Sequence, residues 1–271
     1  MPYLDIHSYG IIGDMHSCAL VGLNGSIDWA CFPQFDSPSC FAAILDDAKG
    51  GRFLIAPEGE HSVQQRYLGD TNVLETTFST ATGVVTVVDF MSIRRPSEEA
   101  PPHQIHRLVR GQSGHVEMRV EFQPRLDYAR GDTKFQFEAN GVLASLGDSR
   151  LALSSPVALN PETSGDGGEK ASAVFTVRAG DTHPFVVAYG ADRPSSLRSL
   201  DSESRLRQAM LYWESSVGKM HYNGLWRDEV VRSFLALHLL MYEPTGAVIA
   251  APTTSLPERI GGERNWDYRF T

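Results

Sequence analysis

The feature that most constrains the fold is a succession of short apolar runs, separated by glycine, aspartate, asparagine and proline, from residue 1 to about residue 198. Within His115–Phe122, apolar side chains alternate with polar ones, which is typical of a strand buried on one face. We also expect strands at Val84–Met91, Ile105–Arg110, Lys134–Ala139, Leu151–Ser154, Ala173–Ala179 and Phe185–Tyr189. Many short strands at this spacing predict a large antiparallel β-sandwich, and hence a mainly β protein.

Turn residues between these runs indicate where the chain reverses. Asn24-Gly25 separates Ala19–Leu23 from Ser26–Trp29, a pattern that predicts a β-hairpin with a type I′ turn. Gly111–Gly114 is expected to separate two strands in the same way. The glycine-rich stretch Gly165–Lys170 has the wrong spacing for a phosphate-binding loop, and we interpret it as a solvated hairpin loop.

The character of the chain changes after residue 198, where helical patterns replace the short runs. Arg193–Ser196 is interpreted as a linker, and Asp201 or Ser202 can cap a helix that carries Leu206, Met210, Trp213 and Val217 on one face. Leu225–Tyr242 predicts a second helix, apolar over most of its circumference. Such a helix should be buried between other helices, and without them it should expose apolar surface.

Composition and charge exclude several classes of function. The net charge is 24 − 33 = −9, which argues against a nucleic-acid or anionic-membrane partner. No run approaches the roughly 20 apolar residues of a membrane span, and no signal peptide is recognised, so we expect a cytoplasmic protein. Cys18, Cys31 and Cys40 match no zinc or redox spacing and are expected to be buried thiols. His103 and His106 would point to opposite faces of a strand, so no metal is assigned.

Two segments hold more aromatic and polar side chains than their predicted elements need. The first comprises Gly13–Ser17, Ser26–Trp29 and Phe32–Pro38. The second comprises Ala250–Glu258 and Gly261–Arg269. Aromatic faces beside aspartate, asparagine and arginine are typical of sugar recognition. The structural alternatives are a core cluster for the first segment and an ordinary interdomain loop for the second.

These segments resemble a known family. Thr253–Glu258 followed by Arg264–Arg269 is similar to the entry into the catalytic domain of bacterial glycoside hydrolase family 15, the glucoamylase and trehalase type. Tyr9–Asp14, Gly25–Trp29 and Phe35–Pro38 resemble the trehalase-like N-terminal domain of the same proteins. The resemblance implies a β-sandwich, a linker helix and then an (α/α)6 barrel that hydrolyses α-glucosides with inversion.

The resemblance also implies roles for particular residues. Tyr268 matches a position that lines the glucose pocket, and Trp266, Asp267 and Arg269 match the surrounding motif as substrate-binding candidates. The two catalytic glutamates of the family would lie beyond residue 271, so no catalytic residue is assigned, and no cofactor is expected. Phe35, in a loop bounded by prolines, is a candidate for the lip of the pocket.

We therefore predict a sandwich domain over residues 1–198, a linker helix over 199–223 and the start of an (α/α)6 catalytic domain over 224–271. The function expected is that of the N-terminal part of an inverting α-glucosidase, inactive as this fragment, whose partners are an α-glucoside and the remainder of the catalytic domain. Trehalose, maltose and isomaltose stay open as substrates, and so does the oligomeric state. The alternative is a free-standing, non-catalytic β-sandwich that binds carbohydrate or protein.

Overall fold

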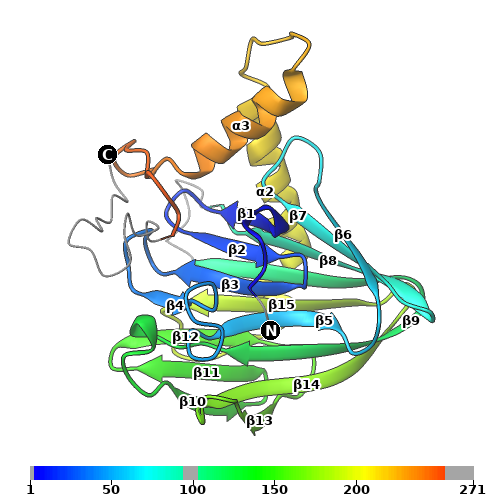
Figure 1. Cartoon of the computed structure of the whole chain (residues 1–271), viewed down its shortest axis with the longest axis vertical. Coiled ribbons are helices and arrows are strands. Elements are labelled where there is room, and N and C mark those ends of the chain that lie inside the picture. The colour runs from blue at the N-terminus through cyan, green and yellow to red at the C-terminus, as the bar shows by residue number, and fades with distance from the viewer. Residues whose placement is uncertain (1–2, 94–102, 254–271) are drawn as a thin grey trace.

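The computed structural model describes residues 3–93 and 103–253, and it is a sandwich of two antiparallel layers (Figure 1). One layer contains β1 (Tyr9–Gly13), β2 (Cys18–Gly22), β3 (Ser26–Cys31), β4 (Ser39–Phe41), β5 (Arg52–Pro57), β13 (Asn160–Thr163) and β14 (Glu169–Arg178). The other contains β6 (Ser62–Tyr67), β7 (Leu74–Ser79), β8 (Gly83–Met91), β10 (Lys134–Glu138), β11 (Gly141–Leu146), β12 (Ser149–Ser154) and β15 (Thr182–Tyr189). The expected mainly β, antiparallel fold is confirmed.

A single long strand, β9 (Gln104–Gln123), belongs to both layers. Its first half pairs with β8 and β15, and its second half pairs with β5 and β14. The predicted break at Gly111–Gly114 is therefore wrong, because the chain bends there and continues. A Cβ atom at Gly111 would lie 2.0 Å from the carbonyl oxygen of Arg178, and Gly114 has a positive φ of 59°. These glycines permit the bend that carries β9 from one layer into the other.

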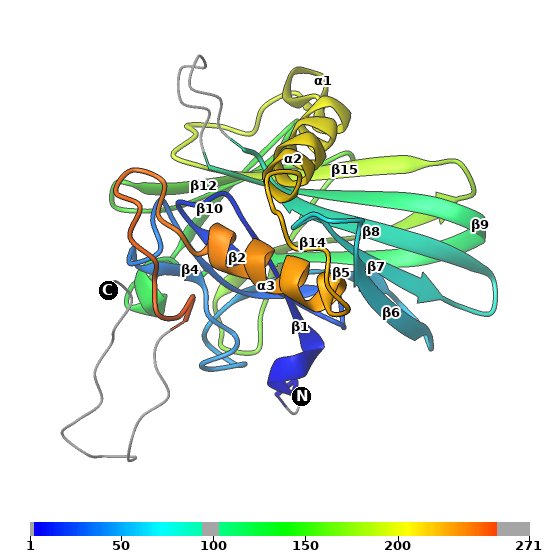
Figure 2. The same cartoon turned by 90° about the horizontal axis from the view of Figure 1, so that it is seen from above.

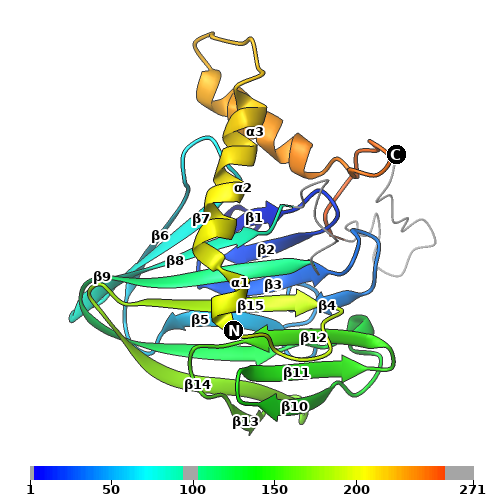
Figure 3. The same cartoon turned by 180° about the vertical axis from the view of Figure 1, so that it is seen from behind.

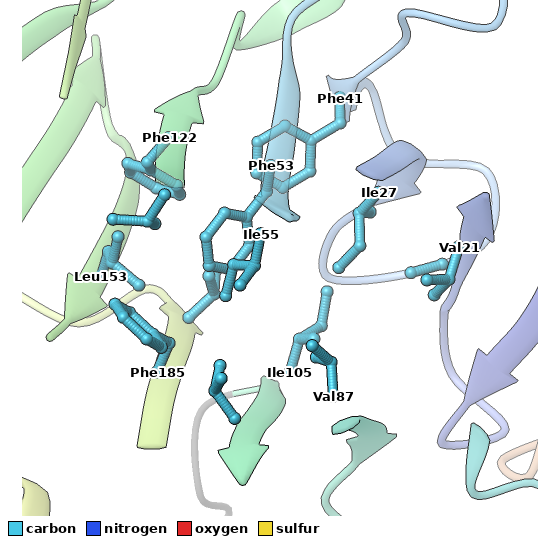
Figure 4. Close-up of a cluster of buried hydrophobic side chains, with 14 of the residues drawn as sticks. Val21, Ile27, Phe41, Phe53, Ile55, Val87, Ile105, Phe122, Leu153 and Phe185 are labelled. Carbon is cyan, nitrogen blue, oxygen red and sulfur yellow. The ribbon is translucent and has the colours of Figure 1, made fainter. Parts of the chain in front are cut away.

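The main hydrophobic core fills the space between the layers (Figure 4). Phe53 and Phe122 from the first layer meet Leu153 and Phe185 from the second, and all four side chains are almost completely buried. The alternation predicted for His115–Phe122 is confirmed, because Val116, Met118, Val120 and Phe122 are all buried in the core. Glu121, between two of them, is 7% exposed and is paired with Arg52 and Lys170.

The hairpin predicted around Asn24-Gly25 is confirmed, as β2 and β3, but its turn is not type I′. Gly25 has a φ of 79°, whereas Asn24 does not have the positive φ that a type I′ turn requires. The Gly25 N–H donates to the Gly22 carbonyl oxygen (2.9 Å), and the pairing shifts register between Leu20 and Val21. Glycine is needed at position 25 for a second reason, because a Cβ atom there would lie 2.2 Å from the carbonyl oxygen of Ile55.

Helices follow the last strand and pack on the outside of the sandwich. They are α1 (Leu197–Leu200), α2 (Ser202–Val217) and α3 (Arg227–Leu239), and two short 3-10 helices lie earlier in the chain, η1 (Ile6–Ser8) and η2 (Asp127–Ala129). The Asp201 side chain accepts a hydrogen bond from the Ser204 N–H (3.2 Å), which confirms the predicted cap.

Helix α2 lies against the outer face of the layer that contains β8 (Figure 3), whereas α3 crosses the end of the sandwich beside β1 and β2 (Figure 2). A second hydrophobic cluster joins both helices to the sandwich. Val88 and Phe90 of β8 are buried there with Trp213 of α2 and Leu235 of α3. The helix predicted over Leu225–Tyr242 is therefore shorter, and it packs on the sandwich rather than between helices. Leu225, Trp226 and Leu237 remain exposed, so the expectation of exposed apolar surface holds only for part of this segment.

His106 connects β9 to the start of α2 within this second cluster. Its ring stacks on Phe90 (4.8 Å between centroids), and its two nitrogens lie 2.9 Å from the hydroxyl oxygens of Ser92 and Ser202. Burial, together with the nearby Arg205 charge, lowers the pKa of His106 from 6.5 to about 3. The imidazole is therefore neutral in the folded chain at pH values where it is partly charged in the unfolded chain.

We expect His106→Gln to flatten the pH dependence of stability below pH 6.5. As the pH falls, the unfolded wild-type chain binds a proton at His106 that the folded chain does not bind, so stability is lost. From pH 6.5 to 5 this loss amounts to about 1–2 kcal/mol, which the variant should not show. Urea titrations of both proteins across this range measure it, and equal pH slopes would contradict the assignment.

Candidate functional site

The unusual N-terminal motifs meet the C-terminal segment of the described chain at one end of the sandwich (Figure 1). We call this region the junction: residues 13–17, Trp29 and Phe35, with His103 at the start of β9, on one side, and residues 239–252 on the other. It is the place where the sandwich holds the chain that leads on to residues 254–271, and we describe it as the candidate site.

Asp14 organises the sandwich side of the junction. One carboxylate oxygen accepts hydrogen bonds from the N–H groups of His16 (3.0 Å) and Ser17 (2.8 Å), and the other lies 2.9 Å from Nδ1 of His103. This turn gives Met15 a positive φ of 65°. A buried carboxylate with these partners is satisfied and acts as a structural clamp on the β1–β2 loop.

His16 and Met15 then contact the C-terminal segment directly. The N–H of Glu243 donates to the carbonyl oxygen of Met15 (3.0 Å), and Nε2 of His16 lies 3.5 Å from a carboxylate oxygen of Glu243. The Tyr242 ring packs edge-on against His16, with 5.7 Å between centroids. The segment after α3 is therefore bound through its backbone as well as its side chains.

Trp29 provides the contact that lies farthest along the chain. Its ring is fully buried, and its Nε1–H donates to the carbonyl oxygen of Pro252 (2.7 Å), 223 residues away in sequence. Beside it in β3, the Asp28 carboxylate accepts from the Tyr9 hydroxyl (2.7 Å) and from Ser26. Burial and the Asp28 charge raise the pKa of Tyr9 well above its usual range, so its hydroxyl remains a donor.

Phe35 and Gly13 fix how closely α3 approaches the junction. The Phe35 side chain is 1% exposed and packs edge-on against Tyr242, with 6.5 Å between centroids. A Cβ atom at Gly13 would lie 2.8 Å from the Leu239 side chain, so glycine allows this close contact. Phe35 thus contacts the segment beyond the sandwich as a buried side chain, and its role at the lip of the pocket stays a prediction.

The substrate-binding candidates Trp266, Asp267, Tyr268 and Arg269 lie outside the described residues, so their roles stay predictions. Sequence reasoning missed His103 and Glu243 as members of the junction. His103 was considered only as a metal ligand in a pair with His106, and the structure places these two histidines in different clusters. Glu243 was not singled out, because no local pattern relates it to His16.

The part of the chain that the structure describes offers no cluster of three or more histidine, cysteine, aspartate or glutamate side chains suited to a metal ion. Over the same residues, no helix is both long and apolar enough to cross a membrane. Cys18, Cys31 and Cys40 are buried, and burial raises the pKa of the Cys40 thiol well above its usual range.

Two family models match successive parts of the chain. Residues 3–213 match the family model described as trehalase-like, N-terminal, and residues 224–271 match that of glycosyl hydrolases family 15. The chain is 34% identical over 99% of its length to a trehalase of Thermoplasma volcanium, and 35% identical over 93% to one of Thermoplasma acidophilum. It is 32% identical over its whole length to a trehalase of Mycolicibacterium smegmatis. The chain spans 43% of the length of each of these relatives.

Proposed function

Because the chain belongs to the family of trehalase-like N-terminal domains, we propose that it is the N-terminal part of an inverting α-glucosidase of the glycoside hydrolase family 15 type. Trehalose is the first substrate to test, since the relatives above are named trehalases, and maltose and isomaltose are the next. We further propose that residues 1–198, 199–223 and 224–271 correspond to the sandwich, the linker helix and the start of the (α/α)6 domain, in a cytoplasmic protein.

The observation that carries this proposal is the Trp29–Pro252 hydrogen bond together with the Glu243 contacts. They bind the stretch immediately before the Thr253–Glu258 and Arg264–Arg269 motifs to a buried end of the sandwich. A loop that binds substrate supports catalysis only when it holds the substrate in a fixed position relative to the catalytic groups. A misplacement of about 1 Å can lower the reaction rate a hundredfold. We infer that the sandwich positions the loop carrying the sugar contacts of Trp266, Asp267, Tyr268 and Arg269.

In the complete enzyme, hydrolysis with inversion requires two carboxyl groups on opposite sides of the glycosidic bond, roughly 6.5–9.5 Å apart. One protonates the leaving oxygen, and the other activates water on the opposite face of the sugar. The family resemblance puts both beyond residue 271. The contribution of this chain would therefore be to line part of the glucose pocket through Tyr268 rather than to transfer protons.

We expect the 271-residue chain to show no hydrolysis of trehalose, maltose or isomaltose. The acid and base together account for a large part of the rate, since each contributes about 10²–10⁴-fold in general acid–base catalysis. The measurement is glucose release by the purified chain, beside a full-length relative as the positive control.

Two variants make this assay decisive. If activity copurifies with the chain, Trp266→Ala and Trp226→Ala should be compared, since Trp226 is an exposed tryptophan at the start of α3 with no predicted sugar contact. Turnover that Trp266→Ala abolishes and Trp226→Ala preserves would show that this chain is itself catalytic, and the fragment proposal would be wrong.

A further inference from the structure

A cavity of about 420 Å³ opens at the end of the sandwich where the 32–38 loop faces η2 and the β11–β12 hairpin. Its size lies within the range of about 300–1,000 Å³ that is typical of small-molecule sites. Its lining residues include no member of the junction and none of the predicted substrate contacts. It adjoins the junction through Phe32, whose ring lines the cavity and lies 6.2 Å from the ring of His103.

One wall of the cavity is aromatic. Tyr189, at the end of β15, is half-buried, and its ring stacks on Phe32 with 5.9 Å between centroids and 20° between planes. Because Phe32 is itself buried within the sandwich, it holds the Tyr189 ring in place. An aromatic ring fixed at the edge of a cavity is suited to stacking against the C–H face of a sugar.

The opposite wall is polar and carries both signs of charge. Asp127 and Arg130 line the cavity, and their nearest side-chain atoms lie 3.5 Å apart. Their side chains are 44% and 70% exposed, so both retain hydrogen-bonding capacity for a ligand. An adjacent carboxylate and guanidinium together accept from and donate to neighbouring hydroxyl groups. The Asp127 carboxylate disfavours an anionic ligand, and the Arg130 guanidinium disfavours a cationic one. The pair therefore favours a neutral ligand with several hydroxyl groups.

The backbone of this polar wall has an unusual conformation. Asp127, Tyr128 and Ala129 are consecutive non-glycine residues with positive φ values of 52°, 55° and 57°. A positive φ is rare for residues other than glycine and costs free energy, so the surrounding structure must stabilise it. Residues in this conformation cluster at ligand-binding and active sites. Here Arg125, next but one before Asp127, is anchored by hydrogen bonds to Asp166 and Ser164, so the turn that presents Asp127 and Arg130 is firmly supported.

We propose that this cavity binds a neutral glucose-type sugar, stacked on Tyr189 and hydrogen-bonded by Asp127 and Arg130. The choice of glucose-type sugars rests on the proposed function, whereas the cavity and its aromatic and polar walls are observed in the structure itself. The site would hold a glucoside on the sandwich beside the junction, and so raise its concentration near the catalytic domain.

Isothermal titration of the 271-residue chain with glucose, trehalose and maltose tests the proposal. Weak binding, with a dissociation constant of about 1 mM, is the expected result for so open a site. Arg130→Ala, Asp127→Asn and Tyr189→Ala should each weaken it at least about tenfold. Asparagine tolerates a positive φ, so Asp127→Asn removes the charge without breaking the turn. Arg130→Ala changes an exposed side chain, so it keeps the test valid if Tyr189→Ala does not fold.

Matched controls separate the cavity from the rest of the chain. Arg66→Ala removes another exposed arginine that is paired with a carboxylate, and Tyr222→Ala removes a partly exposed tyrosine in the α2–α3 loop, so both should bind sugar like the wild type. The double variant Trp266→Ala/Tyr268→Ala removes two of the predicted substrate contacts. Sugar binding that this variant retains and that the three cavity variants weaken is assigned to the cavity.

Two results would overturn the proposal. One is no detectable binding of any of the three sugars at about 50 mM, far above the expected dissociation constant. The other is binding that the double variant abolishes and the three cavity variants preserve. The second result would support the proposed substrate contacts of Trp266 and Tyr268 and would exclude sugar binding in the cavity. If a longer protein failed to hydrolyse α-glucosides, the proposed function would be wrong, but the titration would still test the cavity.

Discussion

Replacing Arg107 by methionine is expected to lower the free energy of unfolding by about 3–5 kcal/mol, the range for breaking a buried ion pair from one side. Arg107 and Asp89 are both completely buried between the two layers, with Nε and Oδ1 2.7 Å apart. Methionine fills similar space, but it leaves the Asp89 carboxylate without its countercharge in the core.

The arginine also joins the layers to each other. From β9 it donates to the carbonyl oxygens of Phe53 (2.6 Å) and Gly25 (2.7 Å), and its guanidinium lies 4.9 Å from the centroid of the Phe53 ring. Both acceptors belong to the opposite layer, so the substitution removes interlayer hydrogen bonds together with the ion pair. Denaturant unfolding followed by circular dichroism measures the loss.

The control for Arg107→Met is Arg66→Ala, which removes a pair between Arg66 and Glu75 with a similar 2.7 Å separation but with the arginine side chain 73% exposed. This variant should cost about 1 kcal/mol or less, because the solvent around the exposed guanidinium screens its attraction to Glu75. Comparable losses for the two variants would show that the ion pair inside the sandwich is not what stabilises the fold.

Phe35→Ala is expected to cost about 3–5 kcal/mol, the range for truncating a buried phenylalanine. Phe35 lies with Met15, Cys18 and Leu239 in the cluster that binds α3 to the sandwich, and alanine would leave a cavity there. Thermal and urea unfolding of the 271-residue chain measure the effect. Leu237→Ala, on the exposed face of α3, is the control and should change stability by no more than about 0.5 kcal/mol.

The same variant tests the proposed pocket lip when it is made in a full-length protein. If Phe35 also borders the glucose pocket, the folded variant should show a higher KM or a changed preference among disaccharides. Unchanged kinetics of the folded fraction, with the stability lost, would restrict Phe35 to packing. A loss below about 1 kcal/mol in the 271-residue chain would instead contradict the packing role.

Local sequence patterns were sufficient to predict the elements that neighbouring residues determine. The alternation in His115–Phe122, the hairpin flanking Asn24-Gly25 and the cap at Asp201 were predictable because neighbouring residues in the sequence decide them. Strands β1, β4, β5, β6, β7, β11 and β13 were not predicted. Polarity explains this only for β6 and β13, which are largely exposed, because β5, β7 and β11 contain buried apolar side chains. The motifs of residues 13–17 and 26–29 were recognised as unusual, but not the partners that they bind.

The sequence by itself determined the antiparallel β character of residues 9–189, the helical character that follows, and the family resemblance in the two motif-bearing segments. Only the tertiary structure decided that β9 continues through Gly111–Gly114, that Arg107 is buried with Asp89, and that Trp29 binds Pro252. Each of these depends on residues that are distant in the chain or in separate layers. Local propensity and periodicity describe a residue's near neighbours, whereas burial, charge pairing and close approach depend on what the fold places opposite it.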